Sequence, residues 1–216
     1  MSEGAAGSMA GTVAGSMAGS AANVGTIAVI GAGVTGRGIA QAAALAGYRT
    51  ILEDLLPNAL RMAETEIRAH LDEAVGRGAL KTVDAAAALS LLEYADSIEQ
   101  AARLADLVIE SVPDELESKL EIFTMLDKIC RPNTIFAANT STLCISEIAS
   151  VTYRAKKCVG MRFVNPVAAM KTLEIVRTLE TDADTLAAVV EVGRRMCEKV
   201  VVLKDAPAVF PIPSLS

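Results

Sequence analysis

Short apolar runs alternate along this chain with longer stretches in which apolar residues recur every three or four positions. The short runs predict buried strands, which we expect at residues 27–30, 49–53, 104–110, 134–138, 158–163, 173–176 and 200–203. The longer stretches predict helices, which we expect at residues 37–46, 57–75, 82–92, 97–102, 146–149 and in a segment that ends at 198. A further helix is expected to begin at Pro113 and Asp114. This alternation predicts an α/β fold with a doubly wound, mostly parallel sheet of the Rossmann type.

The residues that follow the first predicted strand contain three glycines in the spacing G-x-G-x-x-G, at Gly31, Gly33 and Gly36. The first glycine permits a tight turn, the second lets the backbone approach a pyrophosphate, and the third lets the next helix pack against the strand. The N–H groups at the start of that helix point at the same place. We therefore predict a dinucleotide-binding turn that also includes Val34 and Thr35.

Asp54 ends the second predicted strand, at about the 20-residue separation from the glycines that a ribose-binding acid has. Such an acid accepts hydrogen bonds from a ribose 2′-hydroxyl and repels a 2′-phosphate, so it predicts NAD rather than NADP. The alternative interpretation is a simple glycine turn followed by an aspartate on the surface.

More polar residues gather at or just after the ends of predicted strands, namely Glu110, Asn139 to Ser141, Arg162 and Asn165. Ligands bind at the carboxyl ends of the strands in sheets of this kind. Each residue taken alone has a structural alternative, because Glu110 could cap the next helix and Ser141 could belong to an ordinary turn. Their clustering favours a binding site.

Composition narrows the classes of partner. The 216 residues carry a net charge of −6, which argues against nucleic acid or an anionic membrane as the main partner. No apolar run approaches the roughly 18 residues of a spanning helix. The four cysteines are far apart and form no C-x-x-C pair, so we expect reduced thiols and no metal site.

The ends of the chain differ in composition from the middle. Residues 1–23 consist mainly of Gly, Ala, Ser and Met, which predicts a flexible tail. The dinucleotide-binding domain is expected over residues 24–207, followed by an irregular tail at 208–216, where two prolines prevent a helix. No Lys or Arg precedes Arg37, so neither a secretory signal nor a mitochondrial presequence is indicated and we expect the cytoplasm.

Four stretches in the same order resemble the NAD-binding domain of 3-hydroxyacyl-CoA dehydrogenases: residues 31–41, 107–113, 139–143 and 165–171. The resemblance runs from about residue 24 to residue 207. It implies an NAD-dependent oxidoreductase that converts 3-hydroxyacyl-CoA to 3-oxoacyl-CoA in the β-oxidation of fatty acids. It also implies that Asp54 holds the adenosine ribose and that Glu110 and Lys119 lie along the cofactor site.

At the reaction end of the site, the resemblance implies that Ser141 bonds the substrate's 3-oxygen, with Asn139 and Asn165 nearby. Glu174 would orient a catalytic histidine. The family has His-Phe-Phe-Asn-Pro where this chain has Arg-Phe-Val-Asn-Pro, beginning at Arg162. The histidine is the base that takes the hydroxyl proton, whereas arginine stays protonated in proteins. We expect Arg162 to pair with Glu174 instead.

A second difference concerns the helical domain that follows in the family and completes the acyl-CoA site. Here the sequence after Pro207 does not resemble it, so a helical partner or a homo-oligomer would have to supply that half of the cleft. The only histidine, His70, is expected on a helix surface with no chemical role. Three interpretations remain open: a dehydrogenase of this family, an NAD(H)-binding protein that does not catalyse, and a truncated remnant.

Overall fold

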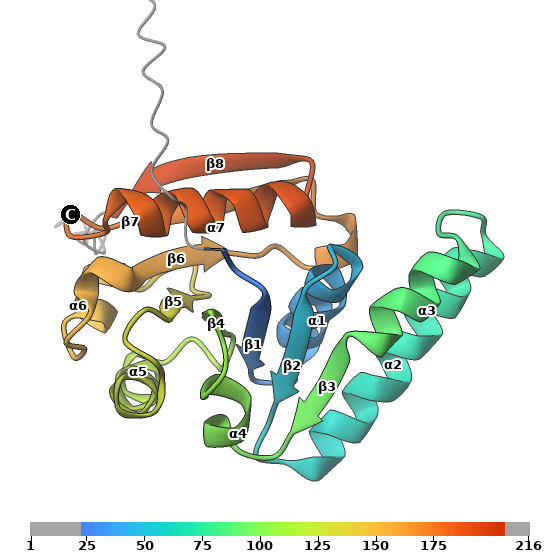
Figure 1. The fold of residues 1–216 in the computed structure, drawn as a ribbon, viewed down its shortest axis with the longest axis horizontal. Coiled ribbons are helices and arrows are strands. Elements are labelled where there is room, and N and C mark those ends of the chain that lie inside the picture. The colour runs from blue at the N-terminus through green and yellow to red at the C-terminus, as the bar shows by residue number, and fades with distance from the viewer. Residues whose placement is uncertain (1–22, 206–216) are drawn as a thin grey trace, which may run out of the picture.

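The computed structural model describes residues 23–205, so the predicted tails fall almost entirely outside the described part. An eight-stranded sheet runs through the middle in the order β3-β2-β1-β4-β5-β6-β7-β8 (Figure 1). The strands are β1 Thr26–Ile30, β2 Arg49–Glu53, β3 Leu92–Ala95, β4 Leu107–Glu110, β5 Ile135–Ala138, β6 Cys158–Arg162, β7 Thr172–Arg177 and β8 Lys199–Lys204. Only β6 and β7 pair antiparallel, and the predicted doubly wound, mostly parallel sheet is confirmed.

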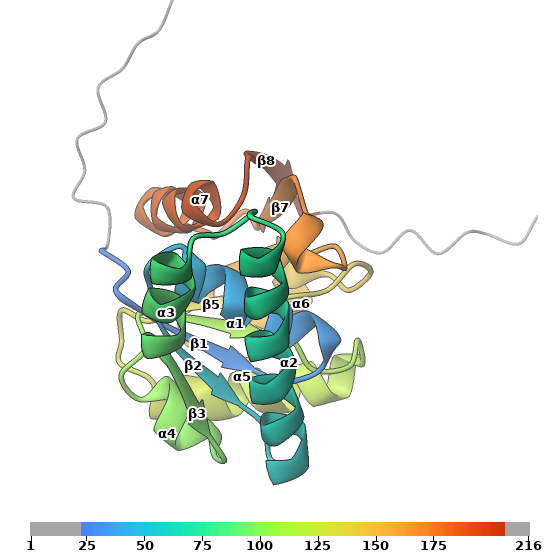
Figure 2. The ribbon, with the colours of Figure 1, turned by 90° about the vertical axis from the view of Figure 1, so that its right-hand side faces the viewer.

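Helices cover both faces of this sheet (Figures 1 and 2). The α-helices are α1 Val34–Leu45, α2 Pro57–Gly76, α3 Thr82–Ser90, α4 Ile98–Ala102, α5 Leu116–Ile129, α6 Ile145–Ala149 and α7 Ala183–Met196. Two short 3-10 turns, η1 Ala155–Lys157 and η2 Val167–Ala169, flank β6. Helices α2 and α3 lie side by side as a hairpin in front of β2 and β3 in Figure 2.

Two hydrophobic cores result, because neighbouring residues of a strand point to opposite faces of the sheet. In β1, Ile27 and Val29 belong to the core shared with α1, α2 and α7, whereas Ala28 and Ile30 belong to the core shared with α4, α5 and α6. All four are at most 1% exposed. Burial of a large apolar side chain contributes about 1.5–3 kcal/mol, so the central strand anchors both layers.

Several predicted boundaries are wrong by a few residues. The strand β3 was not predicted, because we expected one helix to continue to residue 92. Strand β4 begins at Leu107 rather than at 104, because Asp106 instead accepts hydrogen bonds from the backbone N–H groups of Gly25 and Thr26, both at 2.9 Å. Helix α5 begins at Leu116, later than the expected start at Pro113 and Asp114.

The start of α7 also differs from the sequence interpretation. The spacing of Thr181 and Asp184 in the sequence predicts a capping box, but the capping residue is Asp182, which accepts a hydrogen bond from the N–H of Thr185 at 2.7 Å. Thr181 instead donates its hydroxyl to the carbonyl of Cys158 at 2.9 Å. The capping side chain is therefore one residue away from the predicted one.

Candidate functional site

The glycine turn between β1 and α1 has the geometry that the sequence predicts. Gly31 has a φ of 101°, a conformation that side chains disfavour. A Cβ on Gly36 would lie 1.8 Å from the carbonyl oxygen of Gly31, so only glycine permits this approach of helix to strand. At Gly33 a Cβ would meet nothing within 4 Å. The backbone there is open to a ligand, as a pyrophosphate requires.

The first turn of α1 is available to an anion. Among residues 23–205, no side chain caps this helix start, and Val34 is 60% exposed. The first N–H groups of a helix have no partner within the helix and carry the positive end of its dipole. Thr35 lies in this turn and accepts a hydrogen bond from the side-chain amide of Asn165 at 2.6 Å. The turn is thereby tied to the connection between β6 and β7.

Asp54 follows β2 and lies directly beside the glycine turn. One carboxylate oxygen accepts a hydrogen bond from the N–H of Ala32 at 2.9 Å, and the other accepts one from Leu56 at 2.9 Å. Each carboxylate oxygen can accept more than one hydrogen bond, so Asp54 is held in place with acceptor capacity left over. Its position beside the glycine turn and its remaining acceptor capacity are what a ribose-binding acid needs.

The glycine turn opens onto a cleft of about 370 Å³ at the carboxyl ends of the central strands. It is lined by Gly33, Val34, Thr35, Ser111, Val112, Pro113, Asp114, Asn139, Thr140, Ser141 and Phe163. The structure thus brings together the predicted Gly33, Val34, Thr35, Asn139 and Ser141. The residues after β4 and Phe163 were not predicted, although their position after strand ends was the available signal.

Glu110 and Lys119 are fully buried behind this cleft. The Lys119 ammonium donates to the two Glu110 oxygens at 2.8 and 2.9 Å and to the carbonyl oxygen of Asn139 at 3.1 Å. Burial raises the pKa of Glu110, and the charge of Lys119 opposes that rise. Because both side chains are 0% exposed, they shape the wall of the cleft rather than line it.

Asn139 joins two sides of the cleft. Its amide donates to the Ser111 hydroxyl at 3.2 Å, and its side-chain oxygen accepts from the N–H of Phe163 at 3.2 Å. Ser111 follows β4, Asn139 follows β5, and Phe163 follows β6. One side chain therefore sets the spacing of three consecutive strand ends.

Arg162 and Glu174 are paired across the antiparallel strands β6 and β7. An Arg162 terminal nitrogen lies 3.7 Å from a Glu174 oxygen, which confirms the expected ion pair. The Arg162 Nε also donates to the carbonyl oxygen of Thr140 at 3.1 Å. Thr140 directly precedes Ser141, so the guanidinium lies beside the predicted reaction end.

Glu53 is a buried acid that the sequence interpretation missed. It is 2% exposed, and its Oε1 has no hydrogen-bond partner among the described residues. Burial, with a smaller effect from the charge of Asp54, raises the pKa of Glu53 to about 7. It belongs to β2 at the ribose end of the site, where its proton makes stability depend on pH.

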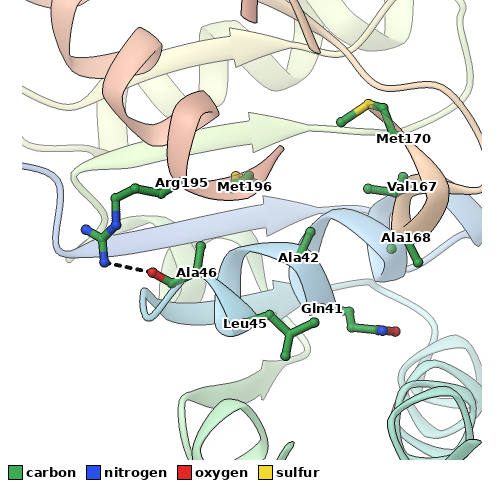
Figure 3. A pocket seen from close by; sticks show the side chains of 10 residues that line it. Gln41, Ala42, Leu45, Ala46, Val167, Ala168, Met170, Arg195 and Met196 are labelled. Atoms are coloured by element: carbon green, nitrogen blue, oxygen red, sulfur yellow. Dashed lines mark hydrogen bonds between the residues drawn. The ribbon is translucent and has the colours of Figure 1, made fainter. Parts of the chain in front are cut away.

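A second hollow, of about 190 Å³, lies between α1, η2 and the end of α7 (Figure 3). Val167 packs closely over Gly38, where an added Cβ would lie 3.0 Å from the valine Cβ. Arg195, its only charged lining residue, donates to the carbonyl of Ala46 at 2.7 Å. The hollow shares no lining residue with the cleft. It separates packed elements and is not part of the candidate site.

Other reactive side chains lie apart from the cleft or are buried. His70 is exposed on α2. Burial raises the pKa of the Cys130 and Cys158 thiols to about 11. Within residues 23–205, no three His, Cys, Asp or Glu side chains gather in a way that would hold a metal ion. In the same part of the chain, no helix has the length and apolar character needed to cross a bilayer.

A glycine turn at a helix start, an acid after β2 and a cleft at the strand ends together define a dinucleotide-binding domain of the dehydrogenase class. Residues 26–206 match the family described as 3-hydroxyacyl-CoA dehydrogenase, NAD binding domain. The chain belongs to this family, and its cofactor is NAD.

Individual relatives agree with this assignment. The chain is 36% identical over 181 residues to a probable 3-hydroxybutyryl-CoA dehydrogenase of Bacillus subtilis, which covers 84% of this chain and 63% of that protein. It is 35% identical over 187 residues to the human mitochondrial hydroxyacyl-coenzyme A dehydrogenase, covering 84% of this chain and 59% of the relative. The chain thus spans less than two thirds of either relative.

Solved structures show the same fold. The 3-hydroxybutyryl-CoA dehydrogenase of Escherichia coli superposes with a TM-score of 0.83 at 35% identity and covers 86% of this chain and 39% of its own. The (S)-3-hydroxybutyryl-CoA dehydrogenase of Ralstonia eutropha gives a TM-score of 0.82 at 32% identity, with 86% and 65% covered. The match extends over nearly all described residues.

Proposed function

We propose that this chain binds NAD(H) across the strand ends and does not by itself oxidise 3-hydroxyacyl-CoA to 3-oxoacyl-CoA. The open backbone at Gly33 and the uncapped start of α1 support binding of the pyrophosphate. Asp54 would bond the adenosine ribose. Bound NAD supplies a hydride acceptor.

The residues at the other end of the cleft would then contact the nicotinamide half and the substrate. Asn139 and Ser141 line the cleft there, and Asn165 is held close to it by its bond to Thr35. Ser141 would bond a substrate oxygen. Glu110 and Lys119 would act by fixing the cleft wall from behind.

Arg162 is the single observation that argues against oxidation. Removing a proton from an alcohol needs a base whose pKa lies near the working pH, and such help is worth about 10²–10⁴-fold. A guanidinium has no lone pair to offer. Arg162 donates to the carbonyl of Thr140 and lies 3.7 Å from the carboxylate of Glu174, so an ion pair stands where the family is expected to have a histidine base and its orienting acid.

The competing candidate is a dehydrogenase whose base and acyl-CoA cleft are completed by a helical partner or by a second copy of this chain. The family assignment favours this candidate. Under it the substrate is an acyl-CoA. We also propose a cytoplasmic location, which cell fractionation would test.

Calorimetric titration with NADH tests the binding proposal directly. We expect saturable one-site binding, and no such binding by Gly36→Val, whose side chain would displace the turn. Gly76→Ala is the matched control, because a Cβ there meets nothing within 4 Å. Absence of NADH binding to the unaltered chain, with Gly76→Ala behaving the same, would contradict the proposal.

A further inference from the structure

Arg162 has donors that the structure leaves free. Its side chain is 30% exposed. Its Nε donates a hydrogen bond to the carbonyl oxygen of Thr140 at 3.1 Å. Nη2 bonds to none of the described residues, and Nη1 has only the 3.7 Å contact to Glu174. The two terminal nitrogens of Arg162 can therefore donate in parallel to the two oxygens of a ligand carboxylate.

Glu174 is a weak competitor for this end. A separation of 3.7 Å exceeds a hydrogen bond, and the Glu174 side chain is 44% exposed. Ion pairs with this exposure contribute little to stability. A ligand carboxylate that accepts two parallel N–H bonds gains more, because bidentate charge-assisted hydrogen bonds are the strong ones.

Arg162 is hydrogen-bonded to the residue that precedes Ser141. The carbonyl that Arg162 holds belongs to Thr140, and Ser141 is exposed in the cleft as the next residue. The Ser141 hydroxyl bonds to no described residue, so it can serve an oxygen of the same ligand. Arg162 does not itself line the cleft, but it bonds to Thr140, and both Thr140 and Ser141 line it.

We propose that Arg162 and Ser141 bind the free carboxylate and a neighbouring oxygen of a small oxo acid or hydroxy acid. The site takes a free acid, because a thioester offers no negative charge to the terminal nitrogens of the guanidinium. This inference rests on the proposed function, because the acid lies at the reaction end of the NAD(H) cleft. It concerns binding only and involves no transfer step.

Titration calorimetry with acetoacetate and its uncharged methyl ester tests this inference, on the full chain with and without saturating NADH. Since a hydrogen bond to a charged group is worth about 1.5–3 kcal/mol, we expect acetoacetate to bind at least about tenfold more tightly than the ester. Arg162→Met should abolish that preference and leave the NADH affinity within about twofold. Arg177→Met is the matched control and should keep the preference, because Arg177 lies on β7 beside Val159, at the opposite end of the β6–β7 pair from Arg162.

Glu174→Gln separates a binding role for Arg162 from a purely structural one. Removal of the competing carboxylate should tighten acetoacetate binding about two- to fivefold, whereas loss of a structural ion pair would not improve it. Equal affinity for acid and ester, no binding of acetoacetate, a preference that survives Arg162→Met, or weaker binding by Glu174→Gln would each overturn the inference. Failure of NADH to bind would contradict the proposed function instead. The titrations of acetoacetate and its ester without NADH would still test whether Arg162 and Ser141 bind a carboxylate.

Discussion

Replacement of the buried Glu53 should change the stability of this domain in a way that depends on pH. The pKa of this acid rises from 4.5 to about 7 in the folded protein, chiefly through burial. Below pH 4.5 the folded and unfolded chains both carry the proton, so the acid costs nothing there. As pH rises, the unfolded chain loses its proton first, and stability falls until the folded acid also ionises near pH 7.

The size of this effect follows from the shift. At 1.36 kcal/mol per pKa unit, the full loss is about 3 kcal/mol, of which about 2–3 kcal/mol falls between pH 5 and pH 8. Glu53→Gln cannot ionise. The change in the free energy of unfolding on Glu53→Gln should therefore be more stabilising at pH 8 than at pH 5 by that amount. The cost of burying an unpaired amide is the same at both pH values, so it cancels in the difference.

Urea unfolding followed by circular dichroism at both pH values measures the difference. Glu121→Gln, on the exposed side of α5, is the matched control and should give the same change at both. For a domain of this size, the expected difference corresponds to about 4–12 °C in Tm. A Glu53→Gln effect that is equal at pH 5 and pH 8 would refute the account of a buried, proton-holding acid.

Three further predictions concern the cofactor site. Gly36→Ala should reduce NADH affinity and lower Tm, because its Cβ overlaps the Gly31 oxygen; unchanged melting would contradict the close approach. Asp54→Ala should narrow the expected preference for NADH over NADPH in calorimetry, because it removes both the ribose acceptor and the repulsive charge. Equal affinities of the unaltered chain for the two cofactors would contradict the assignment of Asp54 as the ribose-binding acid. Lys119→Met should cost about 3–5 kcal/mol in urea unfolding by leaving a buried charge unpaired, and addition of Glu110→Leu should recover much of it; no recovery would show that the pair is not the cause.

Local pattern was sufficient for much of the fold. The apolar run of β1, the glycine spacing and the acid after β2 predicted the dinucleotide turn, because each depends on residues close together in sequence. Strand β3 was missed since its four residues follow a helix without a break and are only partly buried. The antiparallel direction of β7 could not be predicted either, because an apolar run does not show which way a strand runs in the sheet.

The candidate site was predicted less completely, because its contacts join distant parts of the chain. The bond between Thr35 and Asn165 spans 130 positions, and nothing in either segment indicates it. Glu110 and Lys119 were expected along the cofactor site, yet only the structure shows that their side chains are buried behind its wall. Arg162 and Glu174 were expected to pair from the resemblance, and the register of β6 and β7 explains how they meet.

The rate of 3-hydroxybutyryl-CoA oxidation tests the central claim, that Arg162 removes catalysis but not cofactor binding. The comparison uses this chain fused after residue 207 to a helical domain of the family, with and without Arg162→His, each saturated with NAD. We expect equal NADH affinities and a rate at least about 10²–10⁴-fold higher with Arg162→His. Equally rapid oxidation by the fusion that retains Arg162 would contradict the claim.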